Sequence, residues 1–140
     1  MADYVIYDAA AGLGEEAVAS VEAADELIIV TNPEITAVTD ALKTIKLAEE
    51  MDTPVRGVIV TRVKKNKNQM PLANIQEMLG VRVLGVVPED DNVQLALTMK
   101  DAIFHTNPRS RASRAYKQIA ADLAGVKYHA PGLWARMLGK

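Results

Sequence analysis

The feature that most constrains the fold is a series of four short apolar runs, each rich in β-branched or aromatic residues. The runs are Tyr4–Tyr7, Glu26–Val30, Gly57–Thr61 and Val83–Val87. Nearly continuous apolar character is typical of strands that are buried on both faces. The segments between the runs are long enough for crossover helices. The pattern therefore predicts an α/β fold, in which a parallel sheet is flanked by helices on both faces.

Helical stretches separate the apolar runs. In the longest of them, apolar side chains recur every three or four residues. Pro33 suits its first turn, Asn32 is a candidate cap, and Gly80 is a candidate stop signal for a later helix. The expected helices cover residues 15–24, 33–51, 71–79, 92–99 and 108–123.

Length, charge and cysteine content narrow the function classes. A chain of 140 residues fits one domain with a core of its own. The net charge of −2 gives no overall field that attracts nucleic acid, so a nucleic-acid partner is not expected. The absence of cysteine excludes disulfides and thiolate metal sites, and it is compatible with the cytoplasm. We see no signal peptide, and the abrupt start of the first run after Met1 indicates a chain cut from something longer.

The stretch Val5–Gly14 carries the first candidate site. Its apolar run ends in Asp8, and the small residues that follow allow the backbone to approach a ligand closely. Open parallel sheets bind ligands at the carboxyl ends of their strands, where Asp8 is expected. Gly12 and Gly14 lead into a helix whose amino terminus favours an anion such as phosphate. The stretch therefore predicts an acid near a metal or a phosphate at the edge of the sheet.

Other interpretations of this stretch stay open. The spacing from Gly12 to Ala17 fits the dinucleotide fingerprint G-x-G-x-x-G/A, but the acid expected at the end of the next strand is missing. Asp8 could also be a simple cap of the helix that follows. No arrangement of serine, histidine and aspartate indicates nucleophilic catalysis.

Two further features carry less information. The basic loop Lys64–Asn68 is interpreted as a solvated loop, with a phosphate or partner contact as the less favoured alternative. His105 and His129 lack the spaced partners that a metal site needs, so both are interpreted as surface or packing residues.

Several blocks of the sequence resemble the MinD/ParA family of deviant Walker A ATPases, and the MinD branch is the closer match. The start, D-Y-V-I-Y-D-A-A-A-G-L-G, is similar to the D-x-P-A-G segment of the family, with Ala10 where the family usually has proline. The resemblance covers nearly the whole chain and implies a partial P-loop NTPase fold of the SIMIBI type. The other similar blocks are A-D-E-L-I-I-V-T-N-P-E at Ala24–Glu34, V-T-D at Val38–Asp40, V-I-V-T-R-V at Val58–Val63 and L-G-V-V-P-E-D at Leu84–Asp90.

One part of the family pattern is missing. The family's phosphate-binding loop, K-G-G-x-G-K-T, lies upstream of the D-x-P-A-G segment, and no G-x-x-x-x-G-K-[ST] occurs in this sequence. The chain therefore resembles the carboxyl-terminal half of a MinD-type ATPase. The resemblance also implies that a missing strand would lie between Tyr4–Tyr7 and Glu26–Val30, which leaves edges open to pairing. We expect either a rearranged sheet or strand exchange between copies.

The resemblance implies a catalytic role for the first candidate site. Asp8 matches the family aspartate that orients the magnesium shell, through water, and the attacking water itself. Gly12 matches the glycine whose backbone N–H senses the γ-phosphate. Phosphoryl transfer needs such positioning of an acid near the metal more than covalent chemistry.

The resemblance also implies which residues face the adenine base. Thr61 and Arg62 match the segment that packs against adenine, and an arginine plane can stack on a base. Pro88, Glu89 and Asp90 match the loop on the other side of the base. An alternative role for Arg62 is an exposed salt bridge on a loop.

Two more residues match interaction surfaces of the family. Glu34 matches a residue near the nucleotide across the ATP-bound dimer. Asp40 matches the surface used by regulatory partners, which implies a homodimer and a division-regulator protein as partners.

The carboxyl-terminal segment Pro131–Lys140 has an amphipathic pattern. If it is helical, one face carries Leu133, Trp134, Met137 and Leu138. An apolar face with a tryptophan beside cations suits the bilayer interface, and it resembles the family's membrane-targeting helix. The alternative is a tail that packs its tryptophan on its own domain. We expect an ATPase portion over residues 1–128 and a linker with an amphipathic tail over residues 129–140.

Together the residues and the resemblance predict the carboxyl-terminal portion of a MinD-like ATPase of division-site placement. ATP and Mg²⁺ are the implied cofactors, with ATP-dependent dimerisation and peripheral association with the inner face of the cell membrane. This chain alone is not expected to hydrolyse ATP, because it lacks the phosphate cradle. Two alternatives stay open: an adaptor that binds protein without nucleotide, and a different nucleotide-binding enzyme of doubly wound fold.

Overall fold

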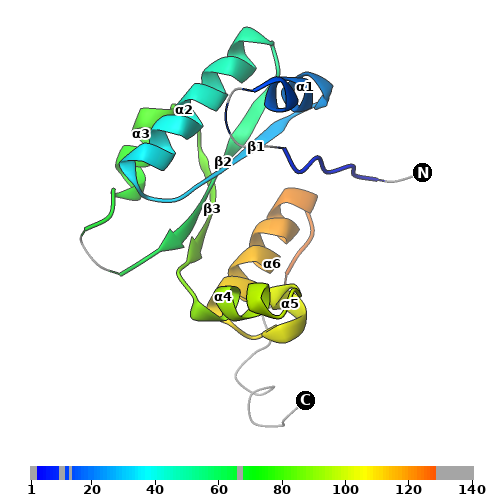
Figure 1. Ribbon diagram of the computed structural model, residues 1–140, viewed down its shortest axis with the longest axis vertical. Coiled ribbons are helices and arrows are strands. Elements are labelled where there is room, and N and C mark those ends of the chain that lie inside the picture. Colours follow the sequence, from blue (N-terminus) through cyan, green and yellow to red (C-terminus); the bar gives the residue numbers. More distant parts are fainter. Residues whose placement is uncertain (1–2, 10–11, 13, 66–67, 129–140) are drawn as a thin grey trace. The chain divides into compact units, whose positions relative to one another are not determined.

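The computed structural model describes residues 3–9, 12, 14–65 and 68–128 of the chain. The chain divides into two compact units, Met1–Val86 and Val87–Lys140, which are described separately below. The elements, labelled in Figure 1, are α1 (Glu15–Ala23), β1 (Leu27–Thr31), α2 (Ile35–Glu50), β2 (Val55–Val63), α3 (Leu72–Leu79), β3 (Val83–Pro88), α4 (Asp91–Thr98), α5 (Ile103–Thr106) and α6 (Arg111–Ala124).

The sheet has three parallel strands in the order β1-β2-β3, which confirms the predicted α/β class. β1 and β2 pair in parallel, with Ile29 opposite Val58 and Thr31 opposite Val60. The register of this ladder shifts between Leu27 and Ile28, where β2 has one extra residue, Arg56. The N–H of Val58 donates to the carbonyl oxygen of Arg82 at 2.9 Å, just before β3.

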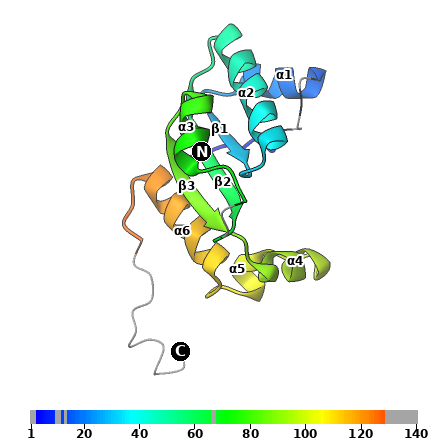
Figure 2. The same cartoon turned by 90° about the vertical axis from the view of Figure 1, so that its left-hand side faces the viewer.

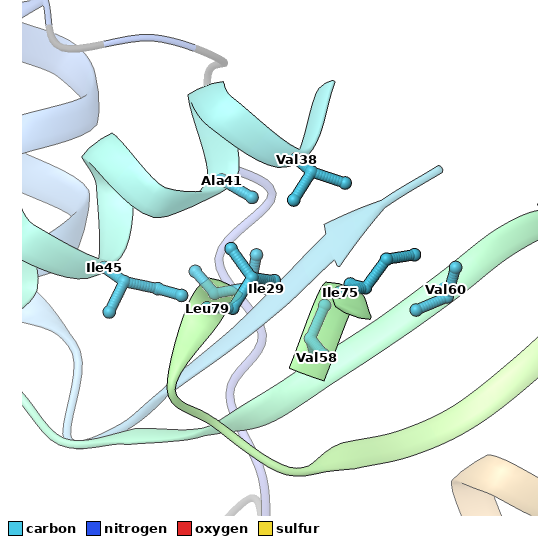
Figure 3. Packing of buried hydrophobic residues seen from close by; sticks show 8 residues of the cluster. All are labelled: Ile29, Val38, Ala41, Ile45, Val58, Val60, Ile75 and Leu79. Carbon is cyan, nitrogen blue, oxygen red and sulfur yellow. The ribbon is translucent and has the colours of Figure 1, made fainter. Parts of the chain in front are cut away.

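The core of the first unit lies between the strands and the helices α2 and α3. Four consecutive residues of β2, Gly57 to Val60, are buried, as expected for a strand covered on both faces, and Val58 and Val60 have no exposed surface. Figure 3 shows the side chains of α2 and α3 meeting those of the strands. The buried cluster consists of Ile29, Val38, Ala41, Ile45, Val58, Val60, Ile75 and Leu79.

The first predicted strand is wrong. Residues 3–9 form no strand, and the side chains of Tyr4–Tyr7 are 57 to 90% exposed. A strand needs backbone partners, and none of the described strands pairs with residues 3–9. The sheet does not rearrange to replace it, because the described sheet begins with β1. Strand exchange between copies stays a prediction.

One face of β1 is bare. Ile28 and Val30 alternate with the buried Ile29 and Thr31, and Val30 is 63% exposed. The expectation of helices on both faces therefore fails at this strand, within the part of the chain that the structure describes. An exposed apolar face on an edge strand favours packing against another segment of protein.

The helices of the first unit agree with the sequence to within about two residues, the usual uncertainty of helix ends. α2 begins at Ile35, and the side chain of Asn32 accepts the N–H of Glu34 at 3.1 Å. The N-cap residue is Glu34, so the predictions that Asn32 caps this helix and that Pro33 lies in its first turn are wrong. Gly80 ends α3 in the left-handed conformation, with φ of 68°, as predicted.

The second unit contains α4, α5 and α6. Figures 1 and 2 both show α4 and α5 next to the end at which α6 begins. The hydroxyl of Ser110 caps α6 by accepting the N–H of Ser113 at 3.1 Å. Phe104 of α5 meets Tyr116 of α6 edge to face, with 6.2 Å between the ring centroids. The sequence pattern missed α5, because four residues are too few to show a helical period.

Candidate functional site

The candidate site of the first unit lies where β1 and β2 end. The hydroxyl of Thr61 donates to the carbonyl oxygen of Thr31 at 3.1 Å, so the ends of the two strands are joined beyond their ladder. Thr31 is buried, and Thr61 is half-buried. This contact places the loops that follow the two strands at one edge of the sheet, where ligands of open parallel sheets bind.

Arg62 stands at this edge in an unusual backbone conformation. Its φ of 56° is in the left-handed region, which a residue with a side chain seldom adopts, and its side chain is exposed. Strain of this kind persists when surrounding contacts fix it. Here the amide of Gln69 donates to the carbonyl oxygen of Arg62 at 3.1 Å, and it accepts the N–H of Lys64 at 2.7 Å. Gln69 thus closes the loop after β2.

A hollow of about 510 Å³ lies beside this loop. The N–H of Met70 donates to the carbonyl oxygen of Pro33 at 3.1 Å, which joins the loop after β2 to the start of α2. The hollow therefore lies between the loops after β1 and β2. Its lining residues are Pro33, Glu34, Ile35, Lys64, Asn68, Gln69 and Met70.

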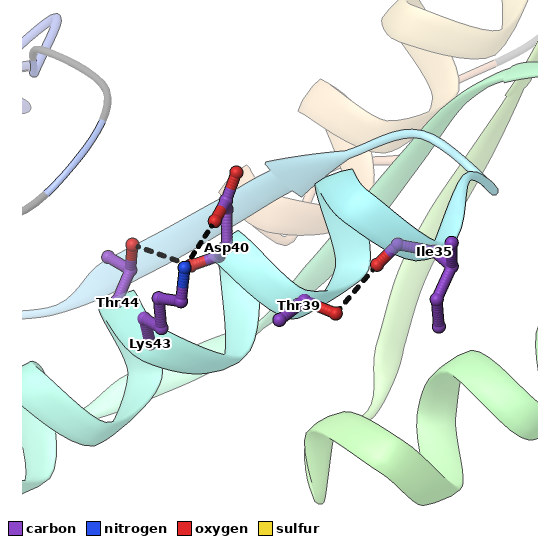
Figure 4. Close-up of polar contacts among 5 residues, drawn as sticks. All are labelled: Ile35, Thr39, Asp40, Lys43 and Thr44. Atoms are coloured by element: carbon purple, nitrogen blue, oxygen red, sulfur yellow. Dashed lines mark hydrogen bonds and ion pairs between the residues drawn. The ribbon is translucent and has the colours of Figure 1, made fainter.

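A second hollow of about 250 Å³ follows the exposed side of α2. Asp40 and Lys43 line it and form an ion pair of 2.9 Å between Oδ1 and Nζ (Figure 4). Both side chains are more than half exposed, so the pair adds little stability and separates at small cost. The hydroxyl of Thr39 donates to the carbonyl oxygen of Ile35 at 2.7 Å, so it is engaged with its own helix.

In the second unit, the loop Pro88–Asp90 is fixed by hydrogen bonds. Oδ1 of Asp90 accepts the N–H and the side-chain amide of Asn92, at 3.1 and 2.7 Å, and so caps α4. Oδ2 of Asp90 accepts the N–H of Ala112 at 3.0 Å. Arg111 donates to the carbonyl oxygen of Glu89 at 3.3 Å. The predicted base-facing loop is therefore fastened to the first turn of α6.

These hydrogen bonds set the charge state of Asp90. Burial raises the pKa of its carboxyl, but hydrogen bonds from Ala112, Asn92 and Ser110 together outweigh burial and leave the pKa below its usual range. A carboxyl whose pKa is lowered by folding adds stability above its unfolded pKa. That stability is lost as the pH falls through the folded pKa.

We expect the substitution Asp90→Ala to lower the free energy of unfolding at pH 7 by about 1 to 2 kcal/mol, because two helix starts lose an acceptor. The difference from the parent shrinks below about pH 4, where the parent carboxyl is itself protonated. Urea unfolding followed by circular dichroism at pH 7 and pH 3 measures both values. Asp91→Ala is the control, since this exposed neighbour offers only a charge near the helix start, and a cost equal to that of Asp90→Ala would contradict the prediction.

Asp8 and Gly12, the residues of the predicted catalytic site, lie before α1, and their roles stay predictions. Asp8 is exposed on the segment outside the sheet. Gly12 has a φ of 101°, and a side chain added there would meet nothing within 4 Å. No described protein atom therefore fills the space at Gly12, and the close approach of a ligand to this backbone stays a prediction. The predicted membrane-facing residues Leu133, Trp134, Met137 and Leu138 lie outside the described residues, as does His129.

Potential metal ligands do not cluster in the part of the chain that the structure describes. Its acidic and histidine side chains form no group of three that could hold a metal ion. Nδ1 of His105 lies 2.9 Å from Oδ1 of Asp101, and this hydrogen bond is the main cause that lowers the pKa of the Asp101 carboxyl. Among the described helices, none is long and apolar enough to cross a membrane.

Comparison with known proteins identifies the family. The family model named ParA, described as an NUBPL iron-transfer P-loop NTPase, matches residues 1–124. The chain belongs to the ParA/MinD family of P-loop NTPases. An uncharacterised ATP-binding protein of Methanocaldococcus jannaschii is 38% identical over 130 residues, which are 93% of this chain and 49% of that protein. The septum site-determining protein MinD of Bacillus subtilis is 38% identical over 129 residues, covering 88% of this chain and 47% of that protein.

Solved structures of the family share the fold. The MinD cell division protein of Aquifex aeolicus has a TM-score of 0.82 at 29% identity, over 91% of this chain and 55% of that one. MinD of Pyrococcus horikoshii, complexed with Mg-ADP, has a TM-score of 0.77 at 28% identity, over 88% of this chain and 52% of that one. A MinC:MinD complex of Aquifex aeolicus has a TM-score of 0.75 at 27% identity, over 86% and 51%. The chain thus spans about half the length of the family members it matches.

The motif G-x-x-x-x-G-K-[ST] does not occur in this sequence, so its residues do not supply the loop and the lysine that hold the phosphates in P-loop proteins. Arg62 is exposed, and its carbonyl oxygen accepts from Gln69, which lines the 510 Å³ hollow; an arginine is a residue type that can stack on a planar ligand such as a base. Gln69 and Ala112 support the predicted loops and were missed by the sequence analysis, because neither stands in a motif.

Proposed function

We propose that the chain is the carboxyl-terminal half of a MinD-like ATPase that acts in placing the division site. The observation that carries the proposal is the edge of the sheet at which Thr61 joins Thr31 and Arg62 is held in a strained backbone conformation. A fixed and exposed arginine at the carboxyl end of a parallel strand is suited to stacking on a nucleotide base.

In this proposal each half of the protein contacts a different part of the nucleotide. This chain supplies the base side, with Thr61 and Arg62 in one loop and Pro88, Glu89 and Asp90 in another. The amino-terminal half supplies the phosphate cradle. Mg²⁺ neutralises phosphate charge when ATP is bound. Asp8 orients the water shell of that ion, and the N–H of Gly12 donates to the terminal phosphate.

We propose that the exposed side of α2 is the interaction surface of the ATPase. Glu34 lines the 510 Å³ hollow and Asp40 lines the 250 Å³ hollow, and both side chains are exposed. Ile35, 59% exposed, lines both hollows and offers an apolar centre between the two acids. In this proposal the second subunit of an ATP-bound dimer contacts the surface at Glu34. A regulator of division contacts it at Asp40. A MinD relative has been solved as a MinC:MinD complex, which supports a regulator as partner.

The proposed tail, residues 129–140, adds peripheral contact with the inner face of the cell membrane. Its apolar positions Leu133, Trp134, Met137 and Leu138 share one face of a helix when the segment is helical. One such short helix binds weakly, so two tails in an ATP-bound dimer are needed for stable attachment.

Turnover measurements test this proposal. We expect the 140-residue chain to release no phosphate from Mg-ATP above background, because the phosphate cradle is absent. The joined protein consists of the part of the M. jannaschii relative that precedes its match, followed by this chain. We expect it to bind Mg-ATP and release phosphate, as followed by a malachite green assay. Turnover by the 140-residue chain, or a folded joined protein that binds no nucleotide, would refute the proposal.

A further inference from the structure

The second unit exposes an apolar surface on α4. Leu95 and Met99 lie one helical turn apart on the same side, with the N–H of Met99 donating to the carbonyl oxygen of Leu95 at 3.1 Å. Their side chains are 51 and 60% exposed. Ala96, between them in sequence, is buried and marks the side of α4 that packs inward. We call the side with Leu95 and Met99 the α4 flank.

Acidic residues surround the α4 flank in sequence. Between residues 89 and 101 the chain has four carboxylates and one ammonium group. Such a surface repels anionic lipid and anionic partners, and it attracts a segment that combines apolar side chains with positive charge. The charged residues are Glu89, Asp90, Asp91, Lys100 and Asp101.

The chain itself contains a segment of that chemistry. Residues 129–140 have no carboxylate side chain and carry Arg136 and Lys140. The same residues include Trp134 and three further large apolar side chains. The tail therefore complements the α4 flank in both charge and hydrophobicity, and both belong to the second unit.

We propose that the tail docks on the α4 flank of its own chain, with the apolar side chains of residues 133–138 covering Leu95 and Met99. Docking withholds the tail from other partners until something competes for it. The proposal does not require that the tail binds lipid, so it can fail or succeed independently of the membrane role proposed above.

The length of the chain allows this docking. The N–H of Ala112 donates to Asp90, so the start of α4 lies at the first turn of α6. α6 has 14 residues and is therefore about 21 Å long. The N–H of Val126 donates to the carbonyl oxygen of Ala121, so residues 125 and 126 still belong to the end of α6. The six residues from 127 to 132 span up to about 20 Å when extended, which is about the length of α6. A short linker also gives an effective concentration in the millimolar range, which favours the tail over a free partner.

The fluorescence of Trp134 tests the proposal, because it is the single tryptophan of the chain. In the 140-residue protein we expect an emission maximum to the blue of a solvated tryptophan. We also expect quenching by acrylamide about twofold weaker than in a peptide of residues 129–140, if roughly half or more of the chains are docked.

Two variants, each replacing exposed apolar residues of α4 by serine, distinguish docking on this flank from nonspecific packing of the tail against the protein. Leu95→Ser with Met99→Ser removes the flank, and the quenching of Trp134 should then match the peptide. Leu97→Ser is the control, because Leu97 is 68% exposed but points to the opposite side of the same helix. All of these side chains are exposed, so the fold is expected to survive, and far-ultraviolet circular dichroism checks this.

Each outcome decides the proposal. Loss of protection in the double variant, with protection kept in Leu97→Ser, supports docking on the α4 flank. Emission of the unchanged chain at the position of the solvated peptide refutes docking. Protection that survives the double variant also refutes it, because the tryptophan then packs elsewhere. Protection that disappears on dilution refutes it in favour of a second copy of the chain.

Discussion

The substitution Gly57→Ala is expected to lower the free energy of unfolding by about 3 kcal/mol or more, since backbone strain and overpacking act at the same residue. Gly57 lies in β2 at a φ of 153°. A Cβ there would lie 2.6 Å from the carbonyl oxygen of Arg82 and 2.7 Å from Cγ of Leu84. The first of these atoms belongs to the backbone beside β3, so it cannot move without loosening the pairing of β2 with β3.

Urea unfolding at pH 7 measures this loss, and Gly14→Ala is its control. Gly14 precedes α1 with a φ of −71°, and a side chain added there meets nothing within 4 Å. We expect the control to lower stability by about 1 kcal/mol or less, because alanine is a poorer N-cap residue than glycine. Equal effects of the two substitutions would show that β2 and β3 do not approach as closely at Gly57 as the structure has them.

The sequence predicted the elements whose pattern is local. The strands β1, β2 and β3 were found because each is a run of β-branched residues that also pairs within this chain. The run Tyr4–Tyr7 has the same local pattern but no partner, and it stays exposed. A strand is a property of two segments, so a pattern in one segment cannot establish it. α5 was missed for the opposite reason, since it is held by neighbours and not by a period of its own.

The candidate site could be predicted only in part. Arg62 and the loop Pro88–Asp90 were placed by resemblance to a family, and the structure adds what holds each of them. Gln69 closes the loop after β2, and the N–H of Ala112 fixes Asp90 from 22 residues away. Such contacts join residues that are distant in sequence and of common residue types, so no sequence motif predicts them. They become visible only when the strands and helices are in place.

The second large expected effect concerns Asp8. In the joined protein, we expect the amino-terminal part to pair with Tyr4–Tyr7 and to turn that run into the strand that the 140-residue chain cannot form. Asp8 then lies at the carboxyl end of this strand, near the metal and the attacking water. Removing its carboxylate is expected to leave the proposed base contact of Arg62 intact, because Arg62 stands on another element. Turnover should therefore fall while nucleotide binding persists.

The expected loss is about 100-fold or more in the turnover number for Asp8→Ala, the size typical of losing a group that positions a proton or a water. The affinity for Mg-ADP should change by less than about threefold, since the diphosphate lacks the terminal group that Asp8 and Gly12 are proposed to face. Glu22→Ala serves as the control, because this exposed residue of α1 has no assigned role. Its turnover should equal that of the parent.

The turnover of the joined protein with and without Asp8 is therefore the most direct measurement of the central claim, that this chain carries part of an ATPase site. We predict that the parent releases phosphate, that Asp8→Ala loses nearly all of this release, and that both bind Mg-ADP as measured by calorimetry. Unchanged phosphate release in Asp8→Ala would contradict the claim.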